Sequence, residues 1–388
     1  MADDYRDSAA WTLTKWETLG LERVFNLADG HAQHPLSKEE LDFVFTLHSA
    51  LTDPTSRPQS QYERDFVDAF FRLAAQTPPA ERPLFHYSSS TSLDVTAKAI
   101  RSAGLADAAI ICPTFDNIPL LMRRNGLHTT PVREPDIWLD EVYRREVLRR
   151  CDVILLVVPN NPTGYVPDRD SFHRVCQDCA SHGKVLIVDF SFRLLSSLHR
   201  WDQYAIARRT EGLRYIFIED TGKIYPLKEL KVGLVSSSGG LASTLRIVSE
   251  EIALNVSPFV LQALAGLFDI DRRRAGPDRE RVLVCSEVVR ANRAYLRARL
   301  GGIPITVESP ASDISVEWLR LQSGSATALC ARLLATGVAI LPGHPFFWDR
   351  SDHQDGHVRV ALARDPHYFA AGATLLVQQI ARLASESG

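Results

Sequence analysis

The sequence predicts an α/β protein: a large domain in which helices cover a mostly parallel sheet, and a smaller α+β domain at the C-terminus. Short, continuously apolar segments such as 153–158 (VILLVV) and 185–189 (VLIVD) alternate with helical patterns, as expected for strands buried on both faces. After residue 268 the pattern changes to a long helix followed by short strands mixed with helices. A chain of 388 residues is long enough to give both domains a core.

The composition excludes several classes of protein. Apolar residues make up 45% and charged residues 23%, which is ordinary for a globular protein in water. A net charge of −3 offers no basic surface for nucleic acid or membrane lipids, and no apolar run reaches the roughly 18 residues that span a bilayer. The acidic N-terminus is unlike a signal peptide, and only Cys176 and Cys179 form a C-x-x-C pair. We therefore expect a cytoplasmic protein with reduced structural thiols and no metal site.

In chain order, residues 1–36 are expected to form an irregular N-terminal arm. Its aromatic residues Trp11, Trp16 and Phe25 indicate that it packs against the rest of the molecule. Capping boxes at 37–40 (SKEE) and 60–63 (SQYE) predict the first two helices.

The large domain is expected over residues 37–268 and the small domain over residues 269–388. In the large domain, strand candidates at 84–87, 108–112, 153–158, 185–189 and 215–220 each precede a loop of unusual composition. Ligands of parallel sheets bind at the carboxyl ends of the strands, so these loops are the candidate site. The small domain contains the strand candidates ITV, ISVEWL, VAILP and HVRVAL and a final helix through ATLLVQQIARLAS.

Several of these loops carry residues that could take part in catalysis or ligand binding. Lys223 stands in a tight turn after 215–220, where a lysine held partly out of water can form a Schiff base. The segment 88–92 (SSSTS) precedes a helix, so the hydroxyls and amides of Ser89, Ser90 and Thr91 suit a phosphate, although a plain helix cap would explain them too. Phe115 could stack on a flat ring or belong to the core.

Three further residues complete the set. Asn161 offers a side-chain amide beside the turn NNPTG, and Asp189 ends a strand where it can pair with a protonated ring nitrogen or cap a turn. Arg359 suits bidentate capture of a carboxylate. Each residue alone has a structural explanation, but their order and spacing along the chain are specific.

This order resembles that of the fold-type I pyridoxal-phosphate enzymes, the aspartate aminotransferase superfamily, from about residue 37 to the end. The resemblance implies that Lys223 carries the internal aldimine and that Asp189 pairs with the pyridinium nitrogen. It also implies the remaining contacts: Asn161 to the ring oxygen, Phe115 on the ring, Ser90, Ser191 and Lys231 at the phosphate, and Arg359 at the substrate carboxylate. Phe192 stands where the superfamily often has a tyrosine, so the ring oxygen loses a hydrogen bond and ordinary transamination is in doubt.

A narrower resemblance lies in LTKWE (13–17), NLADGHA (26–32), YSSSTS (87–92), PTFDN (113–117), DFSF (189–192) and EDTGK (219–223). These segments are similar to those of the O2-using, pyridoxal-phosphate-dependent L-arginine hydroxylases and oxidases, which serve pathways to guanidine natural products such as enduracididine and azomycin. A buried guanidinium must be paired with carboxylates, and Glu17, Asp29 and Asp220 are the candidates, with Thr14 as a neighbour. His31 would move protons or stabilise reduced oxygen above the cofactor, under an arm that closes as a lid.

The resemblance implies that Lys223 removes the Cα proton of arginine and that the resulting quinonoid passes electrons to O2. The products would be 4-hydroxy-2-oxoarginine, 2-oxoarginine or both, with ammonia and hydrogen peroxide, made by a homodimer. The alternatives are an arginine aminotransferase, which needs a 2-oxo-acid acceptor, and an arginine desaturase. A ligand-sensing regulator is disfavoured because the residues before the first helix contain no basic helix-turn-helix.

Overall fold

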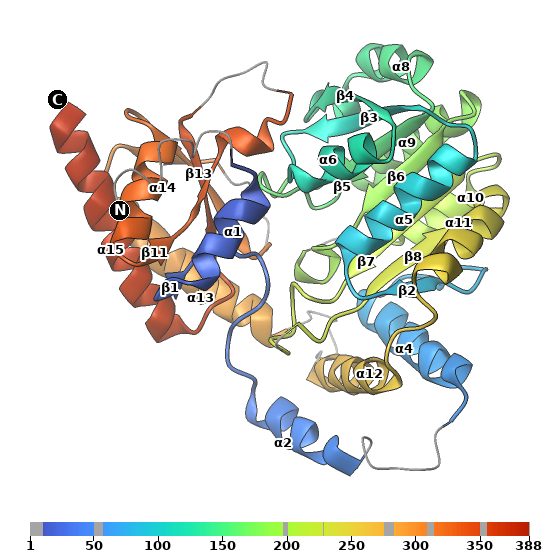
Figure 1. Ribbon diagram of the computed structural model, residues 1–388, viewed down its shortest axis with the longest axis horizontal. Coiled ribbons are helices and arrows are strands. Elements are labelled where there is room, and N and C mark those ends of the chain that lie inside the picture. Colours follow the sequence, from blue (N-terminus) through green and yellow to red (C-terminus); the bar gives the residue numbers. More distant parts are fainter. Residues whose placement is uncertain are drawn as a thin grey trace.

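The computed structural model describes residues 11–49, 57–196, 201–227, 229–274, 283–308, 314–349 and 355–387. Its large domain is built on a seven-stranded sheet in the order β2-β8-β7-β6-β5-β3-β4 (Figure 1). The strands are β2 (Leu84–His86), β3 (Asp107–Cys112), β4 (His128–Arg133), β5 (Val153–Val157), β6 (Val185–Asp189), β7 (Arg214–Asp220) and β8 (Gly233–Ser237). Strands β3 to β7 pair in parallel and β8 runs antiparallel to both β2 and β7, so the mostly parallel sheet is confirmed.

The central strands are buried on both faces, which explains their continuous apolar sequence. Every residue of β5 and β6 is buried. Around the sheet lie α5 (Ser89–Ser102), α6 (Asn117–Arg124), α7 (Asp136–Leu139), α8 (Glu141–Arg149), α9 (Arg169–Ser181), α10 (Gln203–Arg209) and α11 (Gly239–Ile252). Helix α5 packs against α6 and α11, and helix α9 packs against α7, α8 and α10 (Figure 1). In the pairing register, Val157 of β5 lies opposite Asp189 of β6, which lies opposite Ile218 of β7, so these strands end at one edge of the sheet.

The small domain contains an antiparallel sheet in the order β12-β13-β10-β9. Its elements are α13 (Val284–Leu300), β9 (Ile305–Val307), β10 (Val316–Leu321), α14 (Ala326–Ala335), β11 (Val338–Ala339), β12 (Leu341–Pro342), β13 (His357–Ala361) and α15 (Pro366–Ser387). Helix α12 (Pro258–Arg274) packs against α4 (Gln59–Ala74) in the large domain. The expected boundary at 268 falls inside α12. Among the described residues, no helix has the length and apolarity to cross a bilayer.

The expectation of an irregular arm is wrong for the residues that the structure describes; residues 1–10 lie outside them. Helix α1 (Leu13–Leu21) starts at the N-cap Thr12, and β1 (Phe25–Asn26) pairs in parallel with β11 of the small domain. Helix α1 also packs against β11 and β12, next to the small domain in Figure 1. The arm is thus a structural part of the small domain, because its main chain completes hydrogen bonds that β11 would otherwise leave open.

Of the two predicted capping boxes, one is confirmed and one is wrong. Helix α2 (Lys38–Thr46) begins with the reciprocal bonds between Ser37 and Glu40. Helix α4 begins two residues earlier than predicted, after Pro58, and has no side-chain cap. The carboxylate of Glu63 is instead bonded to the side chains of Gln59 and Arg82, and not to the main-chain amide that a capping box requires.

Candidate active site

The predicted site residues meet in one cavity of about 220 Å³ at the carboxyl ends of the strands. It lies between the large domain and the arm, and both contribute side chains. The predicted residues that line it are Thr14, Glu17, His31, Ser89, Ser90, Phe115, Asn161, Asp189, Ser191, Asp220, Lys223, Lys231 and Arg359. Asp29 lies behind His31, and Thr91 is not part of the lining: its amide bonds to the N-cap hydroxyl of Ser88, as the plain helix cap would require.

Lys223 is held by a turn that only glycine permits. The turn after β7 is fixed by paired bonds between Thr221 and Val232, at 3.0 and 2.8 Å. A Cβ atom on Gly222 would lie 2.9 Å from His31 Cδ2 and 2.9 Å from Lys231 Cδ, so a larger residue would push both side chains away. The amine of Lys223 lies 5.7 Å from the ring centroid of Phe192.

Asp189 ends β6 as a buried carboxylate in the cavity wall. Its Oδ1 accepts hydrogen bonds from the amide (2.8 Å) and the hydroxyl (2.5 Å) of Ser191. Burial raises the pKa of Asp189, the Ser191 bonds oppose this, and the charge of Asp220 adds to it. A buried carboxylate with a raised pKa is stabilised by a cationic N–H donor, and a protonated pyridine ring fits that need. The hydroxyl of Ser191, predicted to bind phosphate, is bonded here to Asp189 instead.

Polar groups surround the first turn of α5. The Ser89 amide donates to Asp220 Oδ2 at 2.9 Å, and Ser90 Oγ accepts from Asn117 at 3.1 Å. Strand β8 approaches this turn so closely that a Cβ on Gly233 would lie 2.7 Å from the Ser88 main chain. The N-terminus of a 14-residue helix attracts anions, so the turn fits a phosphate.

Asp220 is fixed beside this turn by main-chain amides. Its Oδ2 takes the Ser89 amide and its Oδ1 takes the Gly222 amide at 2.6 Å. Burial alone would raise the pKa of Asp220, but the charge of Lys223 and these amides lower it below the usual value. Asp220 is therefore a rigid anion next to the lysine.

Arg359 lies on β13, 1% exposed, and reaches the cavity between two aromatic rings. Its Nη1 donates to Asn161 Oδ1 at 3.3 Å, and its Nη2 donates to Glu17 Oε1 at 3.2 Å and to the carbonyl of Ala28. The guanidinium carbon is 5.9 Å from the ring of Phe115. Burial lowers the pKa of Arg359, and the negative charge of Glu17 opposes this.

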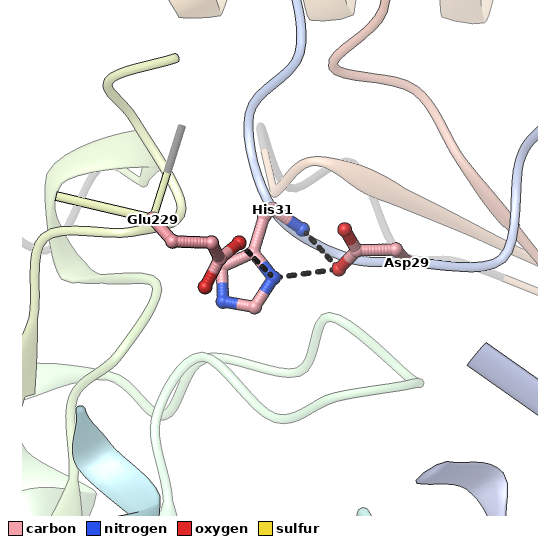
Figure 2. A group of neighbouring side chains, drawn as sticks. All are labelled: Asp29, His31 and Glu229. Carbon is pink, nitrogen blue, oxygen red and sulfur yellow. Dashed lines mark hydrogen bonds and ion pairs between the residues drawn. The ribbon is translucent and has the colours of Figure 1, made fainter. Parts of the chain in front are cut away.

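His31 lies between two carboxylates, Asp29 from the arm and Glu229 from the loop after Lys223 (Figure 2). Its Nδ1 is 2.6 Å from Asp29 Oδ1 and 3.8 Å from Glu229 Oε1, and its Nε2 is 3.0 Å from Lys231 Nζ. Because a lysine ammonium can only donate, Nε2 accepts and Nδ1–H donates to Asp29. Burial alone would raise the pKa of Asp29, but the hydrogen bonds from His31 and the charge of Lys223 lower it well below its usual range.

Lys231, predicted to contact the phosphate, is bonded in the structure to this network of His31 and Glu229. The oxygen and nitrogen atoms of Asp29, His31 and Glu229 lie close enough to ligate a metal ion, within 4.8 Å of one another. The ammonium of Lys231 already neutralises this group, so the geometry is that of an ion-pair network.

Sequence reasoning missed Arg364, a fully buried arginine that holds the arm. Its Nε donates to the carbonyl of Asn26 at 2.6 Å, its Nη1 to that of His31 at 2.8 Å, and its Nη2 to that of Asp29. Burial lowers the pKa of Arg364 to about 10. These bonds shape the loop that presents Asp29 and His31, and nothing local in the sequence marks an arginine for this role.

Asp116 was also missed, although it follows Phe115 in the motif PTFDN. Its Oδ2 accepts the amide of Leu13, at the start of α1, at 2.9 Å. Burial, helped by the nearby charge of Glu17, raises the pKa of Asp116 to about 6. Asp116 thus ties the arm helix to the loop that carries Phe115. An aspartate just before a helix is typical of an N-cap, so the sequence pattern does not indicate the long-range bond between Asp116 and Leu13.

The chain matches the family of class I and II aminotransferases over residues 75–368, and it belongs to that family. A solved structure described as MppP soaked with the product 2-ketoarginine is 30% identical, has a TM-score of 0.83, and is matched over 91% of this chain and 98% of that one. The aspartate aminotransferase of Thermus thermophilus with maleate, 17% identical with a TM-score of 0.74 over 96% of each chain, shares the fold.

A curated relative, the LL-diaminopimelate aminotransferase of Nitratidesulfovibrio vulgaris (strain DSM 19637 / Miyazaki F), is 24% identical over 224 residues. The match spans 56% of this chain and 54% of the relative, so the chain covers about half the length of that protein. The fold-type I prediction is confirmed, and the narrower resemblance is supported by the likeness to MppP. The protein is a pyridoxal-phosphate-dependent enzyme of the aminotransferase superfamily that acts on a small molecule.

Proposed function

We propose that the protein oxidises L-arginine with O2, releasing ammonia and hydrogen peroxide and giving 4-hydroxy-2-oxoarginine, 2-oxoarginine or both. The observation that carries this proposal is that the large domain and the arm both contribute side chains to the wall of the cavity. Lys223 and Asp189 face it from the large domain, and Glu17 and His31 face it from the arm. The arm carboxylate and imidazole give the site features suited to a cationic side chain and to proton transfer.

The residues present suit pyridoxal phosphate. Lys223 would form the Schiff base, Asp189 would accept from the ring nitrogen, Asn161 would donate to the ring oxygen, and Phe115 would stack on the ring. The first turn of α5, with Ser89 and Ser90, would receive the phosphate, with Ser191 and Lys231 after each releases its present partner. When bound, this cofactor supplies an electron sink for the bond to Cα.

The protein's own groups would perform the proton transfers. The Nζ amine of Lys223, once free, takes the Cα proton, and the rigid carboxylate of Asp220 stabilises its charged form. Asp29 fixes the His31 tautomer whose Nε2 accepts, and that nitrogen can take a proton from, or return one to, a species in the cavity.

The substrate would be held at both ends. Arg359 would bind the α-carboxylate, while Glu17 and Asp220, with Thr14, would surround the guanidinium; Asp29, predicted for the same role, lies behind His31 and would act through that imidazole. The closed arm would exclude water and competing acceptors during the reaction. Each oxidation step would remove two electrons and two protons from arginine and reduce one O2 to hydrogen peroxide. Hydrolysis by one water would then release ammonia and leave the 2-oxo group, and a second oxidation followed by addition of another water would give the hydroxylated product.

The second candidate is an arginine aminotransferase, which the family match favours. Incubation of the enzyme with arginine and no 2-oxo acid discriminates between the two. The oxidase should consume O2 and form peroxide over many turnovers, with oxygen from labelled water in the product by mass spectrometry. Turnover only when a 2-oxo acid is added would establish the aminotransferase instead, and an unsaturated product without added water would establish a desaturase.

A homodimer is part of the proposal, because fold-type I sites generally lie at a dimer interface. Apolar side chains of the large domain that a partner could cover include Ile247 and Leu254, 59% and 93% exposed. Light scattering on the eluting protein should give twice the mass of one chain.

A further inference from the structure

The two charged groups proposed to recognise arginine are already paired with each other across the cavity. Arg359 Nη2 lies 3.2 Å from Glu17 Oε1, and both residues line the cavity. Arg359 comes from β13 and Glu17 from α1, and the two are 342 residues apart in the chain. The side chain of Arg359 is 1% exposed and that of Glu17 is 22% exposed, so the pair is largely removed from water.

The remaining contacts leave little room for another anion on Arg359. Nη1 is bonded to Asn161 and Nη2 also to the carbonyl of Ala28. The rings of Phe115 and Phe346 stand 5.9 and 5.7 Å from the guanidinium carbon. A carboxylate binds an arginine best through two parallel bonds, and here one of the two terminal nitrogens is taken by Glu17. A ligand carboxylate must therefore displace Glu17.

Displacement has a cost because Glu17 would be left beside another carboxylate. The charge of Glu17 raises the pKa of Asp116, so the two repel. Asp29 is also close enough to Arg359 for its charge to be felt. A partly buried carboxylate that loses its paired cation is destabilised unless another cation replaces it.

We propose that Glu17 and Arg359 neutralise each other before the substrate binds, as the two charges of the substrate neutralise them in the complex, and that this ion pair sets the specificity of the site. A ligand enters by exchange: its carboxylate takes Arg359 and its side-chain cation takes Glu17. Ligands with a carboxylate but no cation must break the pair without repairing it, so the pair excludes neutral amino acids. This inference rests on the proposed function for the identity of the cation, a guanidinium, and adds the mechanism by which neutral analogues are rejected.

The experiment measures binding of analogues that lack the α-amino group and so cannot react at Lys223. The matched probes are 5-guanidinopentanoate, its neutral isostere 5-ureidopentanoate, and pentanoate, each titrated calorimetrically into the holoenzyme. In the unchanged protein the guanidino compound should bind about a hundredfold more tightly than the ureido compound.

The variant Glu17→Gln removes the charge but keeps the shape, and Glu22→Gln, at the exposed end of the same helix, is the matched control. Glu17→Gln should weaken 5-guanidinopentanoate and strengthen both 5-ureidopentanoate and pentanoate, each by about tenfold. A direct contact alone predicts only the first change. The cofactor absorbance, unchanged in both variants, verifies that the site is still formed.

Two outcomes are separable. If the affinities of pentanoate and 5-ureidopentanoate stay constant or fall in Glu17→Gln, the ion pair does not guard Arg359 and the inference is overturned. If arginine is not oxidised by the unchanged enzyme, the proposed function fails, yet a rise in pentanoate affinity in Glu17→Gln would still support the guarding pair.

Discussion

The cavity has two sides, and they hold their residues by different means. On the large-domain side, parallel strands that end together position Asp189 and, through the next turn, Lys223. On the arm side, buried arginines bind main-chain carbonyls: Arg364 holds the loop 26–31 and Arg359 holds Ala28. One side is thus fixed by the register of a sheet and the other by single long-range side chains. Cofactor binding should therefore be robust, whereas substrate recognition should be sensitive to a few remote substitutions.

The largest expected effect tests the strand-end side. Lys223→Ala removes the only group proposed to form the Schiff base and to take the Cα proton. We expect turnover to fall by at least about 10⁴-fold, with loss of the Schiff-base absorbance. The surface variant Lys38→Ala should retain both. An absorbance that survives in Lys223→Ala would assign the Schiff base to another lysine.

The next effect tests the arm side. Arg364→Met leaves several main-chain carbonyls of the arm without a donor, and we expect the free energy of unfolding to fall by roughly 3 kcal/mol. Arg364→Lys keeps the charge but loses the planar guanidinium, which bonds several carbonyls at once. This variant should still fold, but its arm should be held less firmly. Its KM for arginine should rise about tenfold, with kcat changed less and the cofactor absorbance unchanged.

Limited proteolysis provides a readout of the same variant that does not depend on the substrate. Trypsin should cut the arm of Arg364→Lys at Lys15 or Arg23 faster than that of the unchanged protein, because cleavage follows local opening. An equal cleavage rate together with an equal KM would show that Arg364 does not hold the arm.

The same contrast explains what could be predicted from sequence. The strand-end residues are recognisable because each follows an apolar run by a few positions, as Asp189 and Lys223 do. The arm gave no such signal: α1 was expected to be irregular, and Arg364 and Asp116 were missed. Their partners lie more than 100 residues away, at Asn26, His31 and Leu13. Local periodicity cannot reveal a bond between a side chain and a distant main-chain carbonyl or amide.

Asp116 joins the arm helix to the large domain, and its ionisation should make the free energy of unfolding depend on pH. Its pKa is raised to about 6 in the folded protein, so the native state binds more protons than the unfolded state between roughly pH 4 and 6. Stability from this group is therefore present at low pH and lost as pH rises through about 6. Asp116→Asn can still accept the Leu13 amide but carries no charge.

We expect Asp116→Asn to be more stable than the unchanged protein by about 1–2 kcal/mol at pH 7.5 and equal to it near pH 4. Denaturant unfolding at both values measures this difference. A variant that is less stable at pH 7.5 would mean that the charge of Asp116 strengthens its hold on α1 by more than its burial costs.

The smallest expected effect concerns Phe192, which lines the cavity near Lys223. It lies 5.7 Å from Lys223 Nζ and stands where the superfamily often has a tyrosine. Phe192→Tyr would place a hydroxyl near the ring oxygen of the cofactor, and a donor there favours the electron distribution used in transamination. We expect the ratio of 2-oxo-acid-dependent turnover to peroxide formation to rise about threefold. Phe115→Tyr adds a hydroxyl to another ring of the same cavity and is the matched control. If the two variants change the ratio equally, the missing hydroxyl at 192 does not direct the reaction.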